Sequence, residues 1–163
     1  MRTGTLPSGV QRWLFRAPIW LYRANLGWLF GDRFLLLMHR GRNSGKRRYV
    51  LVEVVYHDQA DDTFYIASGW GEKANWFRNI QHDPQVMIQV GRQRSQRLAS
   101  RLPPDEAASI FFKYAQAHPT AMRALSGFML GTPVPPTAEG AQHLADSVPL
   151  VALRIDTRLA DHT

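Results

Sequence analysis

The sequence Gly41-Arg42-Asn43-Ser44-Gly45-Lys46-Arg47-Arg48 lies between two apolar runs, Phe34-Leu35-Leu36-Leu37-Met38 and the segment from Tyr49 to Tyr56. Glycine and the Asn-Ser pair accept the backbone angles of a tight reversal, so this pattern predicts a β-hairpin. Four of its eight residues are cationic. A glycine turn with exposed backbone N–H groups and surrounding Arg and Lys suits a phosphate or carboxylate ligand. A solvated basic hairpin tip is the alternative, and the spacing is not that of a Walker loop.

The composition is that of one globular domain. The chain has 163 residues, of which 45% are hydrophobic, and it has no cysteine, which excludes disulfides and thiol nucleophiles. We expect a single domain over 1–163, with a leader and amphipathic helix in 1–30 and the barrel core in 34–156. The net charge of +7 comes from dispersed arginines, and the histidines are scattered. We therefore expect neither nucleic-acid binding nor a metal site.

The N-terminal segment predicts an amphipathic helix with a tryptophan-rich face. Trp13, Trp20 and Trp28 recur at helical spacing, with arginines on another flank. Such a helix packs on the core or on a subunit partner, or it makes a peripheral membrane contact through residues 10–30. No secretory signal is visible, and the apolar run 19–30 is too short to span a bilayer. We expect a cytoplasmic protein, with the inner membrane face as a second location.

Six strands and several helices follow from the periodicity of the apolar residues. A polar loop separates the second and third strands, and no regular βαβ alternation occurs, so we expect an α+β fold, mainly antiparallel, in which a barrel is surrounded by helices. Residues 132–140 contain three prolines and predict a loop. The expected strands are 34–38, 49–56, 63–67, 86–90, 93–102 and 148–155; the expected helices are 72–81, 104–118 and 120–131, with a helical turn at 141–146.

A second glycine loop, Ser68-Gly69-Trp70-Gly71, follows the third strand and precedes the helix expected at 72–81. The start of a helix offers free N–H groups and the positive end of its dipole. Lys73 at such a start would lower helix stability, which indicates a compensating anion. Because the first three strands are expected to be neighbours, the two loops can converge on one anionic ligand. Two unrelated surface loops are the alternative.

The ordered motifs resemble the deazaflavin-dependent nitroreductase family. They are LLLMHRGRNSGK, ASGWG, NWFRNI, DPQV and IQVG, within Phe34 to Gly91. The resemblance implies a split β-barrel of about six strands and the cofactor coenzyme F420, a deazaflavin hydride carrier with a phosphate and an oligoglutamate tail. It also implies a homodimer as one possible assembly.

The resemblance implies roles for particular residues. The hairpin turn matches the segment that binds the cofactor's phosphate and acidic tail, and the second loop matches the segment beside the deazaflavin ring. Trp76 and Asn79 match the helix signature. The cofactor-binding residues implied are Arg42, Asn43, Ser44, Gly45, Lys46, Arg48, Ala67, Ser68, Gly69, Lys73 and Asn75.

The activity implied is hydride transfer from reduced F420 to a small electron-poor acceptor, such as a nitro compound, quinone or enone. Ser68 is the candidate hydrogen-bond donor near ring or substrate, and Tyr114 lines the acceptor pocket or donates a proton, unless it is simply packed. Residues 118–131 contain no tyrosine, in contrast to the nitroimidazole-reducing members of the family. Two alternatives stay open: an FMN-binding split-barrel oxidoreductase, and a non-enzymatic binder of lipid or another hydrophobic ligand.

Overall fold

The described part of the protein is a closed antiparallel barrel with helices around it. A computed structural model describes residues 34–158, and the helix and membrane contact expected in 1–30 lie outside this range. The six strands pair in the order β1-β2-β3-β6-β5-β4. They are β1 (Phe34–Arg40), β2 (Arg47–Asp58), β3 (Thr63–Ala67), β4 (Gln85–Val90), β5 (Gln93–Arg101) and β6 (Leu150–Ile155). The predicted α+β barrel is confirmed.

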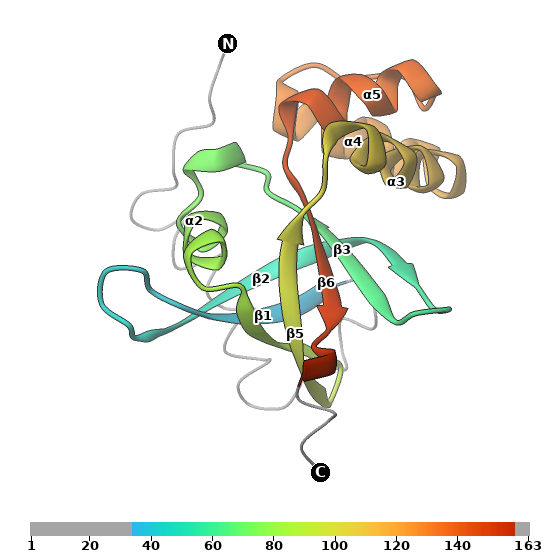
Figure 1. The fold of residues 1–163 in the computed structure, drawn as a ribbon. Helices are drawn as coiled ribbons and strands as arrows, with labels where there is room; N and C mark the ends of the chain where they lie inside the picture. Colours follow the sequence, from blue (N-terminus) through green and yellow to red (C-terminus); the bar gives the residue numbers. More distant parts are fainter. Residues whose placement is uncertain (1–33, 159–163) are drawn as a thin grey trace.

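The helices lie in two groups around the barrel (Figure 1). A short 3-10 helix, η2 (Gly71–Lys73), and α2 (Asn75–His82) pack near β1, whereas α3, α4 and α5 gather on another side. Their bounds are α3 (Pro104–Ala117), α4 (Pro119–Leu130) and α5 (Ala138–Ser147). Within 34–158, no helix is long and apolar enough to cross a membrane.

Two apolar clusters stabilise the barrel and the helices packed around it. The first fills the barrel, with Leu35 and Leu37 of β1 facing Ile66 and Leu153, and it extends to Phe77 of α2. The second lies between the barrel and α3–α5, where Phe111, Met122 and Leu144 are fully buried. Strand residues alternate between opposite faces, so β3 and β6 serve both clusters, Ile66 and Leu153 in one and Tyr65 and Ala152 in the other.

The structure corrects two expected helices. The helix expected at 72–81 is interrupted at Ala74, whose ψ of 129° is extended, so η2 ends before α2 begins. The single helical turn expected at 141–146 is part of a ten-residue helix, α5. Its first turn is stabilised by Thr137, whose side chain accepts a hydrogen bond from the Gly140 N–H at 3.1 Å. The prolines before Thr137 obscured this N-cap in the sequence.

Candidate functional site

The hairpin turn is closed by its own hydrogen bonds. The Gly41 N–H donates to the Lys46 carbonyl at 2.9 Å, the Gly45 N–H donates to the Gly41 carbonyl at 2.8 Å, and the Lys46 N–H donates to Ser44 Oγ at 3.3 Å. Gly45 has a φ of +67°, in the left-handed region that favours glycine. Because these N–H groups are already used, the side chains of the turn are its main means of holding an anion.

The strand register separates the cations of the hairpin. Arg48 pairs with His39, and Arg47 pairs with Arg40. Successive residues of a strand point to opposite faces, so Arg48 and Arg47 diverge. Arg48 lies close to the turn, since a Cβ added at Gly41 would be 3.6 Å from Arg48 Nε. Lys46 is exposed at the tip.

Arg42 joins the turn to α2. Its backbone N–H donates to Asn79 Oδ1 at 3.1 Å, and its Nη1 donates to the same oxygen at 2.8 Å. Its Nη2 also donates to Asn75 Oδ1 at 3.4 Å. Both acceptors are neutral amides, and no carboxylate within 34–158 forms an ion pair with Arg42. The guanidinium is therefore held in place while its positive charge stays available to a ligand.

His39 completes this arrangement from the last part of β1. Its Nδ1 lies 3.2 Å from Asn79 Nδ2, and the side chains of both residues are 5% exposed. Burial, followed by the charge of Arg48, lowers the pKa of His39 to about 4. The imidazole is therefore neutral at pH 7, and its Nδ1 can accept a hydrogen bond from the Asn79 amide.

The second glycine loop is built against α4. The Ser68 hydroxyl, 0% exposed, donates to the Gly71 carbonyl at 2.7 Å, and the Ser68 N–H donates to the Pro149 carbonyl at 3.0 Å. A Cβ at Gly69 would lie 3.6 Å from Met129 Cε, and Trp70 packs edge-on against Phe128. Ser68 thus orders the loop, and contact with a ligand would require its hydroxyl to exchange this bond.

The remaining predicted cofactor residues differ in their placement. Lys73 is exposed and ends η2, so it does not lie in the first turn of α2. Asn75 is the first residue of α2 and meets Arg42, which brings the hairpin turn to the helix that follows the second loop. Asn43 and Ser44 are exposed in the turn, and Ala67 is partly buried beside the helical cluster. Their contacts with a cofactor stay predictions.

An apolar cleft lies between β2 and the corner where α3 meets α4. Its volume is about 740 Å³, and Val54, Tyr56 and His57 line it from β2. Tyr114 and His118 line it from the helices, with their rings 5.7 Å apart. Tyr114 is 4% exposed and belongs to the helical core cluster, so it both packs and borders the cleft. The cleft suits a flat, largely apolar molecule.

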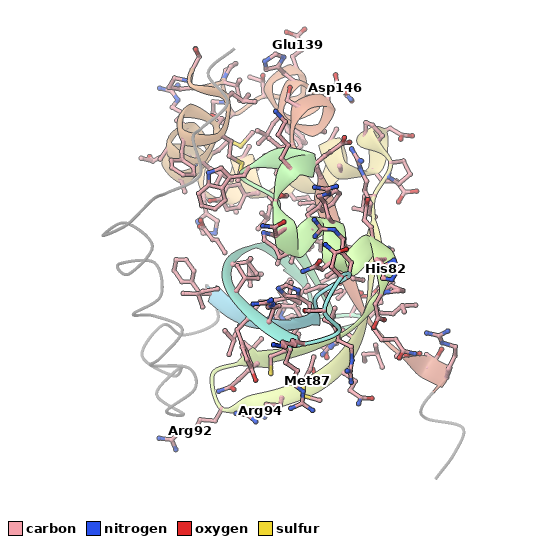
Figure 2. The ribbon with its side chains drawn as sticks, turned by 90° about the vertical axis from the view of Figure 1, so that its left-hand side faces the viewer. His82, Met87, Arg92, Arg94, Glu139 and Asp146 are labelled. Atoms are coloured by element: carbon pink, nitrogen blue, oxygen red, sulfur yellow. The ribbon has the colours of Figure 1, made fainter. Side chains whose placement is uncertain are left out.

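The other cations of the hairpin border a separate groove. Arg40, Arg47 and Arg94 line this groove of about 430 Å³ together with Met87, and His39 reaches its edge. Figure 2 shows Met87 and Arg94 at the β4–β5 end of the barrel, far from Glu139 of α5. The hairpin therefore directs Arg42 and Arg48 toward α2, whereas Arg40 and Arg47 border this second groove.

Two residues of the network around Arg42 were not among the predicted site residues. Asn79 was recognised only as part of a helix motif, and His39 was counted among the scattered histidines. One signal was present: His39 is two and four residues from Leu37 and Leu35, so it shares their inward face of β1. A polar residue at the end of such an apolar face indicates a buried hydrogen-bond partner.

Comparison with solved structures shows that other proteins share this fold. An F420-H2-dependent reductase, FDR-A, has a TM-score of 0.52 at 18% identity, over 76% of this chain and 96% of that chain. A pyridoxamine 5'-phosphate oxidase-related, FMN-binding protein from Nostoc punctiforme has a TM-score of 0.54 at 12% identity, over 94% and 82%. A further match with a TM-score of 0.54 at 17% identity, covering 90% of this chain and all of that one, is a domain-swapped dimer. At these identities the likeness concerns the fold.

Sequence comparison defines the family. The model of the F420H(2)-dependent quinone reductase family matches residues 14–125, and the chain belongs to this family. A relative from Mycobacterium tuberculosis, named "Putative F420H(2)-dependent quinone reductase Rv3178", is 31% identical over 86 residues, which are 52% of this chain and 71% of the relative. The protein is therefore an F420-dependent oxidoreductase. The cationic side chains around the turn, with Arg42 unmatched by a carboxylate among residues 34–158, fit a cofactor that carries a phosphate and acidic tail.

Proposed function

We propose that this chain reduces a quinone, with F420H2 as the hydride donor, and that the cleft between β2 and the α3–α4 corner holds the quinone. The observation that carries the proposal is the cleft itself, which is mostly apolar and is bordered by the buried ring of Tyr114. Family membership supports the same acceptor class. A quinone has a flat apolar body and two polar oxygens, which suits a cleft whose surface is largely apolar but whose lining also carries polar side chains such as Lys113 and His118.

The hairpin side of the site would hold the cofactor's anionic part. Arg42, Lys46 and Arg48 supply positive charge there. The side chains of Asn75 and Asn79 accept hydrogen bonds from Arg42 and hold it in place. Charge-assisted hydrogen bonds to phosphate or carboxylate are about twice as strong as neutral ones. Asn43, Ser44 and Gly45 would shape the turn, and Lys73 would add charge from η2. The loop of Ala67, Ser68 and Gly69 would border the ring.

The reaction needs a hydride and a proton. F420H2, when bound, supplies the hydride; overall the quinone gains two electrons and two hydrogens, and F420H2 loses them. The chain's own contribution is to position the acceptor, exclude water and hold a proton near a quinone oxygen. Several proton-carrying side chains line the cleft, among them His57 and Lys113. Tyr114 and His118 lie there with their rings 5.7 Å apart. We assign the proton-holding role to Tyr114, because its ring is buried there.

A direct assay tests this function. F420H2 is mixed with the purified protein and a water-soluble naphthoquinone, and the recovery of oxidised F420 fluorescence is followed against a protein-free control. We expect oxidation to be faster with the quinone than with a nitroarene or an enone of matched potential. If the protein accelerated F420H2 oxidation with none of the acceptors and bound FMN tightly, the proposal would be overturned.

A further inference from the structure

His39, Asn79 and Arg42 form one continuous chain of hydrogen bonds. It runs from the end of β1 through α2 to the hairpin turn, although Asn79 is 40 residues from His39 and 37 from Arg42. The Asn79 carboxamide is the central group. Its oxygen faces Arg42 and its nitrogen faces His39.

The orientation of the Asn79 carboxamide follows from the donors around it. Arg42 presents two N–H donors to Oδ1, at 3.1 Å from the backbone and 2.8 Å from Nη1. A flipped amide would point its NH₂ at these donors and its oxygen at His39. With Nδ2 toward His39, the imidazole must accept at Nδ1 and carry its proton on Nε2. Each member of the chain then has a matched partner.

The chain is also neutral where it is buried. His39 and Asn79 are each 5% exposed, and burial together with the Arg48 charge holds the pKa of His39 at about 4. A charged imidazole would donate from Nδ1 toward the Asn79 amide, which itself donates. A neutral His39 therefore stabilises the amide orientation that Arg42 requires.

We propose that His39 is a positioning residue for the cofactor. Through Asn79, it holds the Arg42 guanidinium in the orientation that binds the cofactor's anionic tail. The inference rests on the proposed role of the turn. In this proposal His39 acts through Asn79, and its effect is on how firmly Arg42 is held.

The test compares two substitutions of His39. In His39→Asn, the carboxamide oxygen takes nearly the place of Nδ1 and can still accept from Asn79, whereas His39→Leu has no acceptor. The measurements are the Kd for oxidised F420 as a function of salt, and the KM for the naphthoquinone. We expect His39→Leu to raise the Kd about tenfold with a shallower salt dependence, and His39→Asn to stay within about twofold of wild type. The quinone KM should not change.

A second measurement separates this inference from the proposed function. In the ¹⁵N spectrum of labelled protein without cofactor at pH 7, His39 should show a neutral imidazole protonated at Nε2. Failure of the wild type to bind F420 contradicts the proposed function, whereas normal binding by His39→Leu, or an Nδ1-protonated His39, overturns the positioning role. If His39→Leu does not fold, the tautomer measurement decides alone, because it is made on the wild-type protein.

Discussion

The Arg42 guanidinium and the Asn79 carboxamide lie 2.8 Å apart, Nη1 to Oδ1, across 37 residues of chain. This bond, with the one from the Arg42 backbone N–H, attaches the β1–β2 hairpin to α2. A flexible cationic loop loses conformational entropy when it binds an anion, and a loop that is already held in place loses less. The basic turn is therefore a partly preorganised anion site.

Charge removal at the turn should weaken cofactor binding. We expect Arg42→Ala to reduce F420 affinity by roughly 1.5–3 kcal/mol, because a charge-assisted contact is lost. Lys46→Ala should cost less, about 1 kcal/mol, since Lys46 is exposed and screened by solvent. Titration with F420 over a range of salt concentrations measures both, and both variants should show a shallower salt slope.

Arg47→Ala is the matched control for these variants. It removes the same charge from the same hairpin, but Arg47 pairs with Arg40 and borders the other groove. We expect its F420 affinity to stay close to that of the wild type. Unchanged affinity in the Arg42→Ala, Lys46→Ala double variant would contradict the anion-site assignment.

Loss of the Tyr114 hydroxyl should affect turnover rather than cofactor binding. Tyr114→Phe keeps the buried ring that borders the cleft but removes a proton donor. We expect kcat with the naphthoquinone to fall, by up to about 10²-fold, with the Kd for F420 unchanged. The solvent isotope effect on kcat checks whether proton transfer is involved. An unaltered kcat would assign Tyr114 to packing alone.

The buried imidazole of His39 should make stability depend on pH. Its folded-state pKa of about 4 lies below the ordinary value of 6.5 for histidine. Between these values the unfolded chain binds a proton that the folded chain does not, so stability falls as pH decreases from about 6.5 to 4. The shift corresponds to about 3 kcal/mol, present in full above pH ~6.5. Urea unfolding of wild type and His39→Asn at several pH values isolates this contribution, and parallel curves would contradict it.

Gly140 should tolerate no side chain. A Cβ there would lie 1.9 Å from the Pro135 carbonyl oxygen, which belongs to the backbone and cannot move aside alone. We expect Gly140→Ala to lower the free energy of unfolding by at least about 2 kcal/mol through displacement of α5. Gly127→Ala is the control, because its Cβ would meet only the Pro133 ring at 3.3 Å while helix propensity improves. Equal melting temperatures for the two variants would refute the close contact.

Much of the architecture followed from local patterns. Apolar runs of the right length predicted the strands, and the glycines of the 41–48 turn predicted the hairpin that the structure contains. The helix after Pro104 also agrees, because proline and acidic residues suit a first helical turn. The expectations of an uninterrupted helix at 72–81 and of a single helical turn at 141–146 were wrong. Both depend on hydrogen bonds and backbone angles at single positions, which periodicity does not report.

By itself, the sequence determined the strand and helix types, the basic turn and the family, because each depends on residues close together in the chain. Only the tertiary structure decided which cations share a face, which carbonyl accepts the hydrogen bond of the Ser68 hydroxyl, and which residues hold Arg42. Closure of the barrel brings α2 against the end of β1, and this places His39 and Arg42 beside Asn79. Such long-range contacts depend on how the elements pack together, and local propensity does not encode this packing.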